Sequence, residues 1–157
     1  MTFTKQIAKH FKEVFYGGNW TASNLQEQLI DVTHQEAKQK IGSLNTILTL
    51  TYHIHYYVRM VLQVLEGGKL EGNDTFSFDH PQITSEEEWQ NMKEMMWLEA
   101  NCFIACIEEI PDEKLLEVFV NEKYGIMYRN LQGIVEHSHY HLGQIALLKK
   151  LIRSENL

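Results

Sequence analysis

The sequence predicts an all-α protein, a four-helix bundle with long crossover connections and short extra helical turns. Four stretches of the chain repeat apolar residues at the spacing of one helical face, and each is long enough for a bundle helix. Only two prolines and nine glycines interrupt the 157 residues, which favours long elements. A chain of this length can bury a substantial core, so we expect residues 1–157 to form a single helical bundle domain.

The first helix is expected over residues 4–15. Its apolar residues recur at helical intervals and are Ile7, Ala8, Phe11, Val14 and Phe15. The run Gly17-Gly18-Asn19 then ends the helix. We expect residues 20–31 to form a loop that holds a short helical turn around Leu25 and Leu29.

The second long helix is expected over residues 43–66. A short turn should precede it, because Thr33 and Glu36 have the spacing of a capping box. Gly67-Gly68 provides the stop signal at the end of the long helix. Residues 67–83 are rich in Gly, Asp and Asn and are expected to form a long connection, a feature that is often functional in a compact domain.

The third helix has a strong start signal. Ser85 can cap it, and the three glutamates that follow suit the positive end of the helix dipole. Its apolar stripe leads to Ile110, and Pro111 ends the helix. We expect Cys102 and Cys106 to be small core residues, because their spacing on a helix is poor geometry for a disulfide. The stripe consists of Trp89, Met92, Met95, Met96, Ala100 and Phe103.

The fourth long helix is expected over residues 130–153. Before it, residues 112–128 are expected to hold a short turn at 113–119 and an extended piece around Tyr124 and Gly125. The buried side of the fourth helix is expected to consist of Leu131, Ile134, Val135, Ile145, Leu148 and Ile152.

Charge and hydropathy exclude two classes of partner. The formal net charge of −7 argues against nucleic-acid binding, which needs clustered Lys and Arg to neutralise phosphates. No apolar stretch approaches the roughly 18–20 residues of a membrane span. The first residues alternate Lys and His with apolar side chains, unlike a signal peptide. We therefore expect a cytoplasmic protein that acts on a small molecule.

Histidines form the clearest chemical signal in the chain. Five of the eight fall in two short groups, at 52–56 and 137–141, and both groups lie within expected helices. His137 and His141 are four residues apart and therefore share one helical face, which is also the apolar face. Buried imidazoles need partners, and a metal ion would satisfy both. The alternative is a pair of hydrogen-bonded core or surface histidines without a metal.

Helix 43–66 offers His53 or His55 as a third ligand. His53 lines up with apolar residues of that helix, whereas His55 lies on a more mixed face, so we predict His53. Three protein nitrogens with one open position are typical of a catalytic metal site rather than a structural one. His55 and His139 are expected at the rim of the cavity or on the surface.

Other side chains are candidates for supporting groups at this site. Tyr57 lies one turn after His53 and can donate a hydrogen bond to a metal-bound group, or it is a packed core tyrosine. Gln144 can orient a ligand, or it is a solvated or interhelical glutamine. Glu136 points about 100° away from the histidine face and should face solvent. Asp79-His80 in the long connection can reach the mouth of the site, and no catalytic residue is identified.

These residues resemble the DinB/YfiT-like superfamily of bacterial four-helix proteins. The resemblance rests on His53 in the second helix and on a final-helix motif of the type His-x-x-x-His-x-Gly-Gln, which here spans 137–144. It extends over nearly the whole chain and includes Trp20-Thr21 followed by Leu25. The chain departs from the pattern at Leu142, where many relatives carry Arg, so no contact of that Arg is carried over.

The resemblance implies a divalent metal, zinc or nickel, held by His53, His137 and His141, and often a homodimer. Some relatives are thiol S-transferases that use bacillithiol or mycothiol, and one branch isomerises maleylpyruvate with mycothiol. We therefore expect an enzyme that activates a low-molecular-weight thiol for S-transfer to small electrophiles. A metal-dependent hydrolase that uses metal-bound hydroxide is one alternative. A non-catalytic, stress-related metal-binding or structural bundle is another. Three imidazoles suit zinc, nickel, copper or iron, so the residues alone leave the metal open.

Overall fold

The computed structural model describes residues 2–155, and over these residues the protein is all-helical. The predicted all-α class is therefore confirmed. Within the described residues no strand is formed, and Val118 and Ile126 make one isolated antiparallel bridge. The helices are α1 (Phe3–Tyr16), α2 (Leu25–Leu29), α3 (His34–Lys38), α4 (Ile47–Leu65), α5 (Glu86–Glu109) and α6 (Met127–Glu155). Three short 3-10 turns are η1 (Asp74–Phe76), η2 (Asp112–Leu116) and η3 (Glu122–Tyr124).

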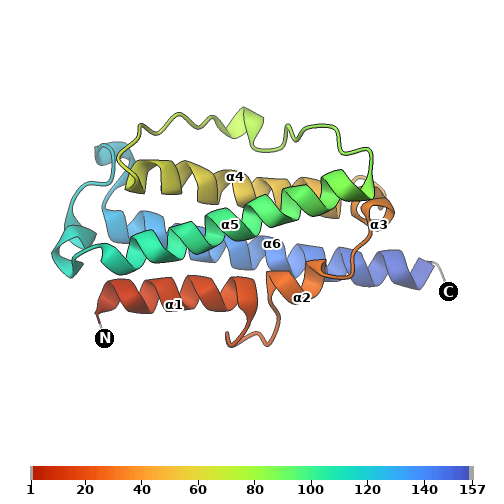
Figure 1. Ribbon diagram of the computed structural model, residues 1–157, viewed down its shortest axis with the longest axis horizontal. Helices are drawn as coiled ribbons and strands as arrows, with labels where there is room; N and C mark the ends of the chain where they lie inside the picture. Colours follow the sequence, from red (N-terminus) through yellow and green to blue (C-terminus); the bar gives the residue numbers. More distant parts are fainter. Residues whose placement is uncertain (1, 156–157) are drawn as a thin grey trace.

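The four long helices run side by side (Figure 1). Helices α1 and α4 each pack against both α5 and α6. The short helix α2 packs against α1 and α6, and α3 packs against α4. The connection from α4 to α5 passes along the outside of α4 and carries η1 (Figure 1). This connection is the long segment predicted at 67–83, and it becomes part of the site described below.

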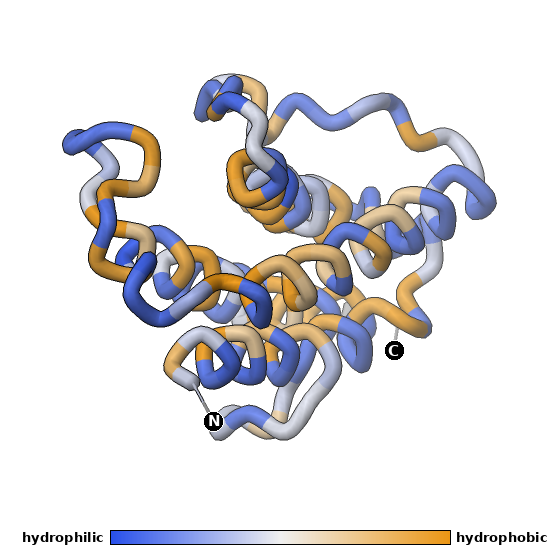
Figure 2. Tube along the Cα trace, turned by 60° about the vertical axis from the view of Figure 1, so that its left-hand side comes forward, coloured by the Kyte–Doolittle hydropathy of each residue, from blue (hydrophilic) through white to orange (hydrophobic). Residues whose placement is uncertain are grey.

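Each long helix is apolar on one side and polar on the other. Figure 2 shows hydrophobic and hydrophilic residues alternating with the turns of the helices. All six residues predicted for the buried side of the last helix are buried. Aromatic rings add to the core, where Phe11 contacts Phe15 at 4.4 Å and Phe103 at 4.7 Å between ring centroids. None of the described helices is long and apolar enough to cross a membrane.

The predicted caps are present where the sequence placed them. Thr33 with Glu36 and Ser85 with Glu88 each form a reciprocal capping box. Helix α4, in contrast, begins at Ile47 rather than near residue 43, because the Thr46 side chain accepts the Thr49 N–H and caps the helix there.

Two expectations for the chain before α6 were wrong. Tyr124 is not extended but ends the 3-10 turn η3, and Gly125 follows with φ of 70°, a left-handed conformation that suits glycine. The extended contact is made on either side of this turn, by Val118 and Ile126. Helix α6 starts at Met127, three residues before the predicted position.

Two expectations for α5 were also wrong. Met95 is 47% exposed and Cys102 is exposed, although both were assigned to the core. Their neighbours Met96 and Phe103 are fully buried instead. Adjacent helical residues point about 100° apart, so only one member of each pair can face the bundle interior.

Candidate metal centre

Three histidines from two neighbouring helices come together in the structure. His53 on α4 meets His137 and His141 on α6, and one nitrogen of each ring lies within 4.8 Å of the others. We call this cluster the three-histidine site. The Nε2 atoms of His53 and His137 are 3.0 Å apart. Two nitrogens bound to one tetrahedral zinc ion lie roughly 3.3 Å apart, so the spacing fits a shared metal ion.

The connection from α4 to α5 orients the His53 ring. The Nδ1 atom of His53 is 3.3 Å from the carbonyl oxygen of Ser77, to which an Nδ1–H group donates. The ring of Phe78 stacks on the His53 ring with 3.9 Å between centroids. A proton held on Nδ1 leaves the Nε2 lone pair of His53 free to face the other two histidines.

A second hydrogen bond orients His141 in the same way. Its Nδ1 atom lies 2.6 Å from Oε1 of Gln144, one turn further along α6. Gln144 therefore contacts His141, and its role in orienting a ligand stays a prediction. Outer contacts of this kind fix which imidazole nitrogen is available and increase its basicity.

His137 differs from the other two histidines. Its Nδ1 atom is buried and, among the described residues, has no hydrogen-bond partner. Its ring contacts the rings of His53 and His141 at centroid distances of 4.8 Å and 4.5 Å, and the latter two are 4.7 Å apart, so the three rings form a triangle. His137 is thus held by packing and by its neighbours in the site rather than by an outer hydrogen bond.

The three imidazoles favour the neutral form. Burial, and to a smaller extent the neighbouring imidazoles of His141 and His53, lower the pKa of His137 to about 4. Burial also lowers the pKa of His53 and His141. Neutral imidazole is the form that binds a metal ion, because its lone pair is free. The donor set and its protonation therefore fit a divalent cation.

Tyr57 packs against the site but does not offer its hydroxyl to it. Its ring contacts His53 and His137 at centroid distances of 5.1 Å and 4.7 Å. The hydroxyl donates to Oδ1 of Asp74, 2.8 Å away in η1. Burial raises the pKa of Tyr57, and the Asp74 carboxylate adds to this. Tyr57 therefore links α4 to the connection, and its hydroxyl is already engaged.

Tyr56 makes a second link to the same connection. Its hydroxyl donates to the carbonyl of Asn73 at 3.0 Å and accepts the Asn73 N–H at 2.8 Å. Together with the Ser77 contact, these bonds hold the segment 73–77 against α4 beside the three-histidine site.

The three-histidine site lines a pocket of about 680 Å³. Its other walls come from α4, from the connection beyond α4, from the segment around η3 and from the first turns of α6. Volumes of 300–1,000 Å³ are usual for sites that bind small molecules. A metal ion in the three-histidine site would therefore be reachable by a small ligand.

His55, in contrast, belongs to a different cluster. The prediction that it lies at the rim or on the surface was wrong, since it is only 7% exposed. Its Nε2 atom lies 2.6 Å from Oε2 of Glu99 on α5, and Arg59 approaches the other carboxylate oxygen at 3.7 Å. This His55–Glu99 pair satisfies the imidazole without a metal.

His139 is also less accessible than expected. It is half-buried and lies edge-on to His10 on α1, with 5.7 Å between ring centroids. Its Nε2 atom is buried without a hydrogen-bond partner among the described residues. It points away from His137 and His141, as its position on the helix requires.

The remaining predictions concern solvent-facing and loop residues. Glu136 is exposed as expected and pairs with Arg129 at 3.3 Å. His80 lies beside Tyr52, with 6.2 Å between ring centroids, so it is Ser77 and Phe78 that contact the histidines instead of Asp79-His80. Neither Ser77 nor Phe78 carries a sequence signal for this role, because a backbone carbonyl and a stacked ring depend on the path of the connection.

Comparisons with known protein families, curated proteins and solved structures found no match for this chain. The resemblance to the DinB/YfiT-like superfamily therefore stays a prediction. The geometry of the three-histidine site and of its pocket is what supports a function for this chain.

Proposed function

We propose that the three-histidine site holds one divalent metal ion, zinc or nickel, and that the protein uses it to activate a low-molecular-weight thiol. One observation carries the metal assignment. The Nε2 atoms of His53 and His141 are left free by hydrogen bonds at Nδ1, and both rings meet His137 at the wall of a pocket. The three rings lie close enough together to share one cation, and among the described residues none of the three pairs with a carboxylate.

The histidines would bind the metal and leave a further coordination position toward the pocket. A bound divalent ion supplies Lewis acidity, which lowers the pKa of a coordinated thiol or water. Ser77 and Gln144 hold the rings of His53 and His141 in place. Phe78 covers one face of the His53 ring and restricts the approach of water from that side.

The resemblance to the DinB/YfiT-like superfamily favours the thiol reaction over hydrolysis. The pocket, of about 680 Å³, is large enough for a small thiol and its electrophile. In the reaction, the thiol loses its proton to solvent and its sulfur forms a bond to an electrophilic carbon. The bond from that carbon to the leaving group breaks, and the leaving group departs with the electron pair. With a chlorinated nitrobenzene the products are a thioether and chloride.

Elemental mass spectrometry of the untagged protein tests the metal assignment. We expect roughly one equivalent of metal in the native protein and almost none in a His53→Ala, His137→Ala, His141→Ala variant. A His10→Ala, His80→Ala variant removes imidazoles outside the site and should keep its metal. A native protein that holds no metal and takes up neither zinc nor nickel would contradict the assignment.

Turnover is tested separately on the metal-loaded protein. Consumption of a chlorinated nitrobenzene or a bimane that requires an added thiol supports the transferase. Ester or amide cleavage without thiol would indicate the hydrolase instead. Metal binding without either activity would indicate a non-catalytic bundle. We also propose that the long helices have the DinB-like arrangement. We propose a homodimer as well, which light scattering tests.

A further inference from the structure

The charged residues that line the pocket are unlike the chain as a whole. The protein carries a net charge of −7, but the charged lining residues are Lys123, Arg129 and Asp74. The Asp74 carboxylate already accepts the hydroxyl of Tyr57. Lys123 is exposed and belongs to none of the ion pairs formed among the described residues, and its ammonium group lies 5.4 Å from the centre of the Tyr124 ring. The pocket therefore presents a cation that lacks a carboxylate partner.

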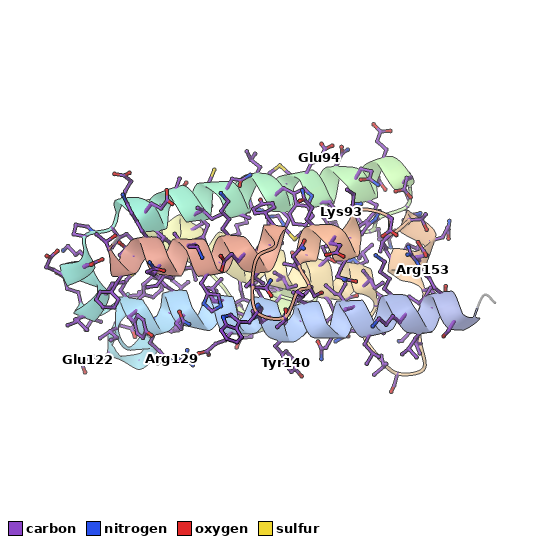
Figure 3. The ribbon with its side chains drawn as sticks, turned by 90° about the horizontal axis from the view of Figure 1, so that it is seen from below. Lys93, Glu94, Glu122, Arg129, Tyr140 and Arg153 are labelled. Carbon is purple, nitrogen blue, oxygen red and sulfur yellow. The ribbon has the colours of Figure 1, made fainter. Side chains whose placement is uncertain are left out.

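Arg129 lies in line with two of the histidines. Residues 129, 133, 137 and 141 are four apart and follow one face of α6. A Cβ atom at Gly133 would come within 3.1 Å of Nη1 of Arg129, so the guanidinium group lies over the glycine. This places it about one helical turn, roughly 6 Å along the axis, from His137. Figure 3 shows Arg129 near the start of α6 and Tyr140 further along it.

The ion pair of Arg129 leaves most of its hydrogen-bonding groups available. Its Nη1 atom is 3.3 Å from Glu136, and the two side chains are 64% and 60% exposed. An exposed pair of this kind contributes at most about 1 kcal/mol to stability. The guanidinium has five N–H donors in a planar fork, which matches a carboxylate.

The rest of the pocket suits an apolar or aromatic body. Its walls include the rings of Tyr56, Phe119 and Tyr124 and the aliphatic side chains of Met60, Leu70 and Ile134. A ligand that spans the distance from Arg129 to the three-histidine site would lie against these side chains. Burial of an aromatic ring there would be favourable.

We propose that this pocket selects a small organic carboxylate, with an apolar or aromatic body, through Lys123 and Arg129. The inference rests on the proposed function, because it names the substrate class of the same pocket. Asp74 and Glu136 lie close to Lys123 and Arg129, so the pocket offers N–H donors without a large excess of positive charge. Such a site suits a monoanion better than the double charge of a phosphate monoester. The carboxylate would lie at the η3 end, and the reacting end of the ligand would face the three-histidine site.

Binding of para-methylbenzoate and of its neutral isostere para-methylbenzamide tests the proposal. Both are titrated into metal-free protein and followed by heteronuclear NMR. Neither probe carries a thiol, so a failure here is distinguishable from a failure of the metal or of the transferase. We expect the carboxylate to bind about tenfold more tightly than the amide. A Lys123→Gln, Arg129→Gln variant should bind the two probes equally.

A matched variant controls for net charge. Lys5→Gln, Lys12→Gln removes two exposed cations from α1 and should keep the preference for the carboxylate. The proposal is overturned if this control loses the preference equally, since a general charge effect would then explain it. It is also overturned if the native protein binds neither probe, or binds both equally.

A second pair of variants keeps the charge unchanged. Gly133→Ala places a methyl carbon 3.1 Å from Nη1 of Arg129, so the guanidinium has to shift, and para-methylbenzoate binding should weaken severalfold. Gly143→Ala meets no neighbouring atom and should leave binding unchanged. Both replacements should stabilise α6, by about 1 kcal/mol each. Loss of binding in a more stable protein would show that Arg129 contacts the ligand, whereas equal binding in both variants would contradict its role.

Discussion

Helix α4 carries two buried histidines, His53 and His55, whose surroundings differ in one respect. Their exposed fractions are nearly equal, at 6% and 7%. His55 meets the carboxylate of Glu99, whereas His53 meets the imidazoles of His137 and His141. Burial therefore does not separate a structural histidine from a candidate ligand. What separates the two kinds of histidine is the charge and the hydrogen-bonding capacity of the group that faces the ring.

The two clusters satisfy their imidazoles by different means. In the His55–Glu99 pair the acid accepts the Nε2–H group, and its negative charge opposes the lowering of the His55 pKa by burial. In the three-histidine site none of the described acids forms an ion pair with a ring, and His141 makes protonation of His53 and of His137 less favourable. The first cluster therefore contains its own negative partner, whereas the second could hold a cation.

Removal of a ligand should give the largest difference between the clusters. His137→Ala should lower the affinity for zinc or nickel by more than about 100-fold, because two nitrogens remain where three are needed. His55→Gln should leave the affinity unchanged. Competition with a chromogenic chelator measures both. Loss of metal in the His55→Gln variant would contradict the assignment of His55 to a structural pair.

Removal of Glu99 should affect stability rather than metal binding. Glu99→Ala leaves the buried His55 without its acceptor and should lower the free energy of unfolding by about 2 kcal/mol. The metal content should not change. Urea unfolding of the metal-free protein measures the difference. Glu94→Ala on the exposed side of the same helix is the control and should change stability by less than about 0.5 kcal/mol.

The hydrogen bond from His141 to Gln144 should have a smaller effect on the metal. Gln144→Leu removes the acceptor and should weaken metal binding about tenfold. Gln144→Glu keeps an acceptor and should restore the affinity, since a carboxylate also accepts from Nδ1–H. Isothermal titration with zinc compares the two variants. If Leu and Glu give equal affinities, the contact has no influence on the ligand.

The smallest effect is expected in the pH dependence of the metal-free protein. The pKa of His137 is lowered in the folded state, from 6.5 to about 4, so the unfolded chain binds its proton more readily. Its contribution to stability is therefore present above pH 6.5 and is lost as the pH falls toward 4. Water in the open pocket reduces the effect, to the order of 1 kcal/mol. Thermal unfolding should show a flatter profile for His137→Gln, and parallel profiles would contradict the assignment.

The sequence predicted the helices because their signals are local. Capping boxes at Thr33 and Ser85, paired glycines and apolar spacing all act within a few residues. The preference for His53 over His55 also followed from the face of one helix. The partner of His55 was not predictable in this way, since Glu99 lies 44 residues further along the chain.

The contacts of the connection were beyond the sequence for the same reason. Ser77 contributes a backbone carbonyl and Phe78 a stacked ring, and neither is part of a motif. Their position follows from the links of Tyr56 and Tyr57 to the residues just before them. Tertiary contacts of this type depend on the path of the long connection along α4, which local sequence patterns do not specify.

The links between α4 and this connection also tie local unfolding to occupancy of the site. Peeling residues 73–77 away from α4 would remove the Ser77 carbonyl from His53 and free the ring to rotate. A metal ion that fixes the ring would therefore oppose this detachment, and by reciprocity the detachment would weaken metal binding by the same free energy. The rate at which a protease cuts this segment would thus serve as a gauge of metal loading, with no substrate needed.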